Sequence, residues 1–140
     1  VAALALGADA VNMGTRFLLT QESPLHPALK ERFVASSERD TVLIGRSYGD
    51  SSRVMRNSVS TQVLEREKQG GVTHKDLLPV IGAARWMEAM ARGDVDGGAI
   101  PLGMSVGLVD DLPTCAELIG RIVSEAQAIV HGRLASAVPA

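Results

Sequence analysis

The chain has 140 residues, 46% of them hydrophobic and 21% charged, and its 14 basic and 16 acidic side chains leave a formal net charge of −2. This composition excludes a mostly disordered chain, and no apolar run approaches the roughly 20 residues that a membrane helix needs. The balanced charge excludes nucleic-acid binding driven by net charge, while the single Cys115 excludes an internal disulfide and fits the reducing cytoplasm.

The first six residues form an apolar, helix-favouring run that neither a methionine nor a basic segment precedes. Without a basic segment this run is not a secretory signal, and it is typical of the interior of a helix. We therefore expect the chain to be the C-terminal fragment of a longer protein that starts inside a helix. Gly7 suits the left-handed residue that ends such a helix.

Residues 8–19 follow, with a strand-like centre and no polar run long enough for a loop. Ser23 and His26, each followed by proline, then mark a helix start, because serine caps helices and proline is tolerated in the first turn. The apolar spacing predicts this helix over 27–36. Helix end, strand and helix in this order are typical of an α/β unit.

Residues 41–44 predict a short strand, because they are apolar and β-branched and end at a glycine. Residues 53–68 predict one or two helices, which a pair of glycines ends. A further helix is predicted over 73–92, with Thr73 and Asp76 placed as a capping box at its start.

Residues 94–98 predict a turn rich in aspartate and glycine. Residues 99–109 are too apolar for a free surface loop and too rich in glycine for an ordinary strand, so we expect them to pack against another segment or a ligand. The last helix is predicted from the apolar stripe within 115–130. Gly132 is expected to end it and 133–140 to form a flexible tail.

Gly14 and Thr15, at the end of the predicted strand, are the first candidates for binding a ligand. A bare glycine lets a phosphate approach the backbone, and the threonine hydroxyl adds a donor. In βα barrels a phosphate commonly binds at the carboxyl ends of the last two strands. By itself the dipeptide is a weak signal, and a strand that simply ends in a turn is the favoured explanation.

Other side chains that could carry chemistry have structural explanations. The histidines lie in helix starts or near a helix end, and no pair has the spacing of metal ligands on a helix, so we expect no metal site at His26, His74 or His131. Cys115 lies on an apolar stripe, which predicts burial rather than catalysis. Asp94 and Asp96 are expected in a turn. For Arg53 and Arg56 a solvated or structural role is expected, with a role of Arg56 and Asn57 at a substrate or domain interface as the alternative.

Several motifs occur together: Gly7 to Phe17, the pairs Glu22-Ser23 and His26-Pro27, Arg53 to Asn57, Gly93 to Gly98, and then Gly103 and Gly107-Leu108-Val109. In combination they resemble the nitronate monooxygenase (2-nitropropane dioxygenase) family, which includes the FMN-dependent enoyl-acyl carrier protein reductases. The resemblance runs from the first residue to about residue 131.

This resemblance implies an α/β fold, namely the C-terminal part of a TIM (β/α)8 barrel with a mostly helical cap domain. Residues 1–36 would supply the end of helix 7, strand 8 and helix 8 of the barrel. Residues 37–132 would form the cap over the barrel mouth, and 133–140 the tail.

The resemblance also implies FMN as the cofactor. Gly14 and Thr15 would bind its phosphate through backbone amides and the hydroxyl, and Gly103, Met104 and Ser105 would lie near the flavin ring. Many relatives carry glutamine at the position of Met104. Methionine cannot donate the hydrogen bond that the glutamine amide could give. The family's catalytic histidine lies in an earlier Gly-Gly-His segment, so no catalytic residue is expected in this chain.

The activity that the resemblance implies first is the oxidation of small alkyl nitronates with molecular oxygen. The alternative is the reduction of an enoyl thioester, with NAD(P)H as reductant. A third interpretation, from another class, is a catalytically inert fragment that serves as a folded or oligomerising module. Because an isolated barrel strand has unpaired edges, we expect a homo-oligomer.

Overall fold

The structure, a computed structural model, describes residues 1–137 and is rich in helices. The α-helices of this part are α1 (Ala2–Ala5), α2 (Thr15–Leu18), α3 (Pro27–Val34), α4 (Ser58–Gln69), α5 (His74–Ile81), α6 (Ala83–Arg92) and α7 (Cys115–Ala128). The two strands are β1 (Thr41–Ile44) and β2 (Ser52–Met55). Shorter helical turns are η1 (Glu38–Asp40), η2 (Arg46–Tyr48), η3 (Met104–Leu108), η4 (Ile129–Leu134) and η5 (Ala135–Ala137).

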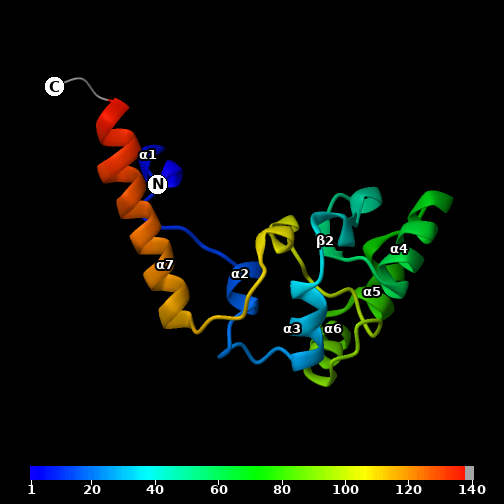
Figure 1. Cartoon of the computed structure of the whole chain (residues 1–140). Coiled ribbons are helices and arrows are strands. Elements are labelled where there is room, and N and C mark those ends of the chain that lie inside the picture. The colour runs from blue at the N-terminus through cyan, green and yellow to red at the C-terminus, as the bar shows by residue number, and fades with distance from the viewer. Residues whose placement is uncertain (138–140) are drawn as a thin grey trace.

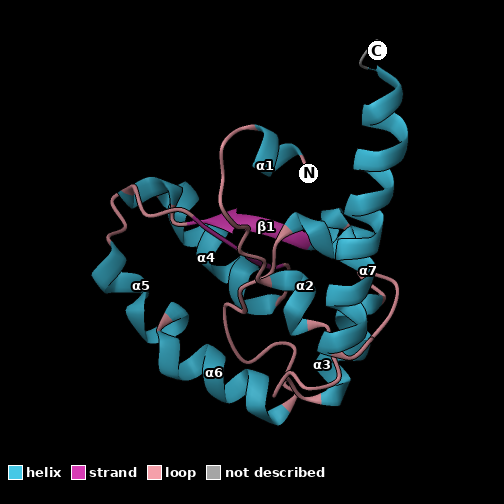
Figure 2. Ribbon diagram, turned by 90° about the vertical axis from the view of Figure 1, so that its left-hand side faces the viewer, coloured by secondary structure: helices cyan, strands magenta, loops and turns pink. Residues whose placement is uncertain are grey.

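Helix α7 and its continuation form a long rod at one side of the molecule, with α1 beside the rod (Figure 1). The hairpin and helices α4, α5 and α6 gather at the other side, and α2 and η3 lie between the two groups. The view turned by 90° shows α5 and α7 at opposite sides of the molecule, with the strands between them (Figure 2). None of the helices within the described part is long and apolar enough to cross a membrane.

Two clusters of buried hydrophobic side chains hold the larger group together. The first surrounds Phe33 of α3 and includes residues of α6 and η3. The second lies between the hairpin and helices α4 and α5. Neighbouring residues of β2 belong to different clusters, Val54 to the second and Met55 to the first, because successive side chains of a strand point to opposite faces. The hairpin is therefore the wall that both clusters share.

The hairpin confirms one predicted strand and corrects one predicted helix. Strand β1 covers 41–44, as expected, and pairs antiparallel with β2. The helix expected from residue 53 onward begins only at Ser58, because β2 occupies the preceding residues. Two glycines in the left-handed region, Gly45 at φ +82° and Gly49 at φ +79°, turn the chain back so that β2 meets β1.

The strand predicted within 8–19 is wrong. Residues 8–13 have no regular structure, and the chain then enters the short helix α2. A strand requires a hydrogen-bonded neighbour, and the only sheet within the described residues is the β1–β2 hairpin. The fold class is therefore mixed α/β in this chain, but the α/β character comes from the hairpin rather than from the predicted barrel strand.

The helix predicted over 73–92 is confirmed in extent but consists of two helices, α5 and α6. The chain bends at Gly82, where a Cβ atom would lie 2.7 Å from the carbonyl oxygen of Leu78. The predicted capping box is confirmed, since the carboxylate of Asp76 accepts bonds from the Thr73 backbone N–H at 2.9 Å and from its hydroxyl at 2.6 Å.

The last helix begins as predicted, with α7 capped by Thr114. The predicted stop at Gly132 is wrong, because η4 and η5 continue the helical path to Ala137. Gly132 is not among the glycines with positive φ, so it does not form the left-handed cap that ends many helices. Residues 133–137 of the predicted tail are thus helical, and 138–140 lie outside the described residues.

An apolar groove of about 620 Å³ runs between α1 and α7. Its lining includes Leu4, Val11, Val123 and Val130, all of which are large hydrophobic side chains that remain exposed. Contiguous apolar patches of this kind mark interaction surfaces in soluble proteins.

Candidate functional site

Gly14 lies at the start of α2, with φ −85° and ψ −72°. A Cβ atom at Gly14 would meet no atom within 4 Å. Because neither the backbone conformation nor the packing requires glycine here, the missing side chain leaves open space above the backbone. The first hydrogen bond of α2 runs from the Leu18 N–H to the Gly14 carbonyl at 3.0 Å, so the earlier amides of the helix have no intrahelical acceptor.

Thr15 connects the two segments that the family resemblance assigns to FMN, although Thr15 and Gly103 lie 88 residues apart in the sequence. Its Oγ1 accepts a hydrogen bond from the Gly103 backbone N–H at 2.9 Å. A Cβ atom on Gly103 would lie 3.0 Å from that same oxygen, so glycine allows the close approach. A threonine hydroxyl has one proton to donate, and within residues 1–137 it has no acceptor, so this donor is free for a ligand.

Met104 and Ser105 begin η3, directly after this contact. Both are exposed, Met104 with 51% of its surface. Val106, one residue further, is fully buried in the first cluster and fixes the turn. The structure therefore brings Gly14, Thr15 and Gly103 to one place and presents Met104 beside it.

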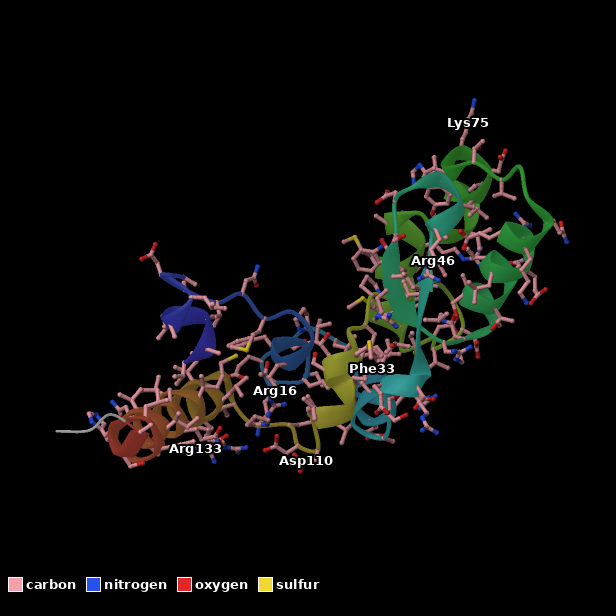
Figure 3. The ribbon with its side chains drawn as sticks, turned by 90° about the horizontal axis from the view of Figure 1, so that it is seen from above. Arg16, Phe33, Arg46, Lys75, Asp110 and Arg133 are labelled. Atoms are coloured by element: carbon pink, nitrogen blue, oxygen red, sulfur yellow. The ribbon has the colours of Figure 1, made fainter. Side chains whose placement is uncertain are left out.

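Arg16 anchors α2 to the segment before α7 rather than facing the open space at Gly14. Its guanidinium donates to the Asp111 carboxylate at 2.6 Å and to the Asp111 carbonyl at 3.3 Å. Arg121 of α7 bonds the same carboxylate, and these hydrogen bonds, that from Arg121 first, hold the pKa of Asp111 below its usual value. Figure 3 shows Arg16 between α7 and the group that carries Phe33 and Arg46.

Asn57, a residue of the basic motif, has a structural role. Its side-chain amide donates to the carbonyls of Val95 and Gly98, both at 2.8 Å, and its side-chain oxygen accepts from the Ser60 N–H at 2.9 Å. It thereby caps α4 and fastens the glycine-rich 94–98 turn to it. Asp96 contributes from the turn, accepting from the Ser58 N–H at 2.8 Å.

The other candidates also have structural surroundings. His26 caps α3 by accepting from the Ala28 N–H at 3.2 Å, and His131 lies on the exposed η4. Asp94 accepts from the Asp96 N–H at 3.0 Å, as its predicted turn requires. Cys115 is only half-buried. Its backbone N–H donates a hydrogen bond to the Glu22 carboxylate at 2.9 Å, and this bond lowers the pKa of Glu22.

A glycine–threonine turn braced by a second glycine-containing loop, with a free hydroxyl and open space above the backbone, is an arrangement typical of a protein that binds a phosphorylated small molecule. The family model for nitronate monooxygenase matches residues 1–125. The chain belongs to the nitronate monooxygenase family.

Its relatives include enzymes with different names. The chain is 31% identical to (3aS,4S,5R,7aS)-5-hydroxy-7a-methyl-1-oxo-octahydro-1H-indene-4-carboxyl-CoA dehydrogenase of Rhodococcus jostii, over 89% of this chain and 45% of that protein. It is 33% identical to nitronate monooxygenase of Pseudomonas aeruginosa, over 89% and 35%. Among solved structures, FabK from Thermotoga maritima matches with a TM-score of 0.83 at 34% identity, over 98% of this chain and 42% of that one. The chain thus spans less than half the length of these relatives.

Proposed function

We propose that the protein containing this chain is an FMN-dependent oxidoreductase and that the chain supplies part of the flavin site. The observation that carries the proposal is the bond from the Gly103 N–H to Thr15 Oγ1 at 2.9 Å, which joins the two segments nominated for FMN. Family membership supports the same cofactor. When bound, FMN supplies the electron transfer that protein side chains alone do not.

In this proposal each residue has a distinct task. Gly14 leaves room for the FMN phosphate to approach the backbone, and the amides at the start of α2 donate to it. Thr15 donates its free hydroxyl proton to the phosphate while its oxygen holds Gly103. Met104 and Ser105 lie next to the flavin ring, where the exposed thioether of Met104 gives an apolar contact without a hydrogen-bond donor.

We further propose that the substrate is an acyl thioester. Two relatives at 31% identity carry a carboxyl-CoA dehydrogenase name, and FabK is an FMN-dependent enoyl-acyl carrier protein reductase. The second candidate is oxidation of an alkyl nitronate with oxygen, which the family description and the Pseudomonas aeruginosa relative favour. In both cases the catalytic histidine is expected outside these residues.

Two assays on the FMN-loaded full gene product, one anaerobic and one aerobic, distinguish thioester reduction from nitronate oxidation. The flavin is reduced with NAD(P)H or with dithionite and then mixed with an enoyl thioester. We expect the thioester to reoxidise the flavin and to be reduced at its double bond. If the flavin stays reduced with thioesters, while the aerobic enzyme consumes oxygen with a nitronate, the second activity is the correct one.

For the architecture, we propose that 1–36 complete a (β/α)8 barrel and that 37–132 form its cap. In such a barrel residues 8–13 gain the neighbouring strand that they lack here, and the apolar groove between α1 and α7 is covered. We place the protein in the cytoplasm, which its single cysteine fits.

For the 140-residue chain alone, we propose self-association through that groove. Light scattering at increasing concentration is expected to show oligomers, and Val123→Lys, which places a charge on an exposed face of α7, is expected to shift them toward the monomer. A chain that stays monomeric at high concentration contradicts the homo-oligomer.

A further inference from the structure

A second cavity, of about 390 Å³, lies between the hairpin and helices α5 and α6. Its volume lies within the range of small-molecule sites in proteins, about 300 to 1,000 Å³. One wall is apolar and comes from both strands, α5, α6 and the segment 99–101. That segment leads directly to Gly103, so the same stretch of chain borders this cavity and the proposed flavin site.

The polar part of the cavity combines aromatic rings with a carboxylate. Tyr48 and His74 contact each other, with ring centroids 5.4 Å apart and ring planes at 56°, and Trp86 lines another part. Asp50 supplies a carboxylate, whereas the Arg53 guanidinium donates to Thr41 Oγ1 at 3.0 Å and so turns to the Met55 face of the hairpin, away from the cavity. Neither the Tyr48 hydroxyl nor the Asp50 carboxylate has a hydrogen-bond partner within residues 1–137.

The loop that carries Tyr48 is held in place before any ligand arrives. The Glu67 carboxylate of α4 accepts from the Gly45 N–H at 3.2 Å and from the Ser47 N–H and hydroxyl at 3.0 and 2.9 Å. Gly45 is buried, and a Cβ atom there would overlap the Asp50 carbonyl oxygen and lie 2.9 Å from the Tyr48 hydroxyl, so this turn requires glycine. Burial, with the nearby carboxylates of Glu67 and Asp50, raises the pKa of Tyr48, which keeps the phenol protonated and able to donate.

We propose that this cavity binds the adenosine part of a nucleotide cofactor or substrate, an inference that rests on the proposed oxidoreductase function. A purine stacks on aromatic rings such as Tyr48 and His74. A carboxylate such as Asp50 accepts hydrogen bonds from ribose hydroxyls. Both NAD(P)H and coenzyme A thioesters carry this group.

The test is calorimetric titration of the FMN-loaded full gene product with two probes, ADP-ribose for the dinucleotide and coenzyme A for the thioester. We expect at least one probe to bind, and Tyr48→Phe and Asp50→Asn each to weaken that binding about tenfold, the loss of one good hydrogen bond. Binding of ADP-ribose alone assigns the cavity to NAD(P)H, and binding of coenzyme A alone assigns it to the thioester.

Asp110→Asn is the matched control, since Asp110 is exposed and lies on the segment before α7, far from Arg46 and Lys75 of the hairpin side (Figure 3). It should bind the probes as the wild type does. The inference is overturned if neither probe binds, or if either cavity variant binds like the wild type. Flavin content is measured in the same samples, so a holoenzyme that binds no nucleotide refutes only the inference, whereas a protein without flavin refutes the proposed function.

Discussion

Replacing Asn57 by alanine is expected to lower the free energy of unfolding by about 3 kcal/mol. The change removes the cap of α4, which is typically worth about 1 kcal/mol. It also leaves the Val95 carbonyl without a donor and takes one of two donors from the Gly98 carbonyl, which still accepts from the Ile100 N–H at 3.0 Å, and each lost bond is worth about 1 kcal/mol. One of these carbonyls belongs to the buried Gly98, where water cannot replace the lost amide.

Urea unfolding of the 140-residue chain, followed by the fluorescence of its single tryptophan, measures this change. Trp86 is a local reporter, because a Cβ atom on Gly98 would lie only 3.0 Å from the Trp86 backbone nitrogen and side-chain Cβ. Asn12→Ala alters the other asparagine, which is exposed, and is expected to change the free energy by no more than about 0.5 kcal/mol. Equal effects of the two variants would contradict the role given to Asn57.

Replacing Thr15 by valine is expected to weaken FMN binding by the full gene product about ten- to hundredfold. Valine keeps the shape of threonine but removes the hydroxyl that would donate to the phosphate, and hydrogen bonds to charged groups are worth about 1.5 to 3 kcal/mol. It also leaves the Gly103 N–H without its acceptor, so the segment leading into η3 is expected to loosen.

Thr15→Ser restores the hydroxyl and is expected to bind FMN nearly as the wild type does. The dissociation constant is measured by the quenching of flavin fluorescence. A valine variant with wild-type affinity would show that Thr15 only braces the loop and does not contact the phosphate.

Local patterns predicted much of the helical structure, because capping and apolar spacing are decided within a few residues. The Thr73–Asp76 box and helices α3 and α7 are examples. Strand β2 was not predicted, because it depends on two left-handed glycines that return it to β1. The strand within 8–19 was wrong for the converse reason, since its sequence suits a strand but this chain offers it no neighbour.

In the candidate site, too, local features could be predicted from the sequence and long-range contacts could not. The sequence nominated Gly14, Thr15 and Gly103 through a family resemblance, but no local pattern predicts a hydrogen bond that spans 88 residues. Asn57 was considered only for a substrate or domain interface, and its contacts with the 94–98 turn lie 38 and 41 residues away. The cavity beside Tyr48 was not foreseen at all, because it forms only when the hairpin folds against α5 and α6.

The most direct test of the proposed flavin site is the FMN affinity of Gly14→Ala in the full gene product, measured together with its thermal stability. Gly14 has a backbone conformation open to alanine and no atom within 4 Å of a new methyl group, so stability should stay within about 0.5 kcal/mol of the wild type. If the phosphate approaches this backbone, the methyl group obstructs it and FMN affinity falls at least about tenfold. Unchanged affinity in a stable variant would contradict the assignment of this turn to the flavin phosphate.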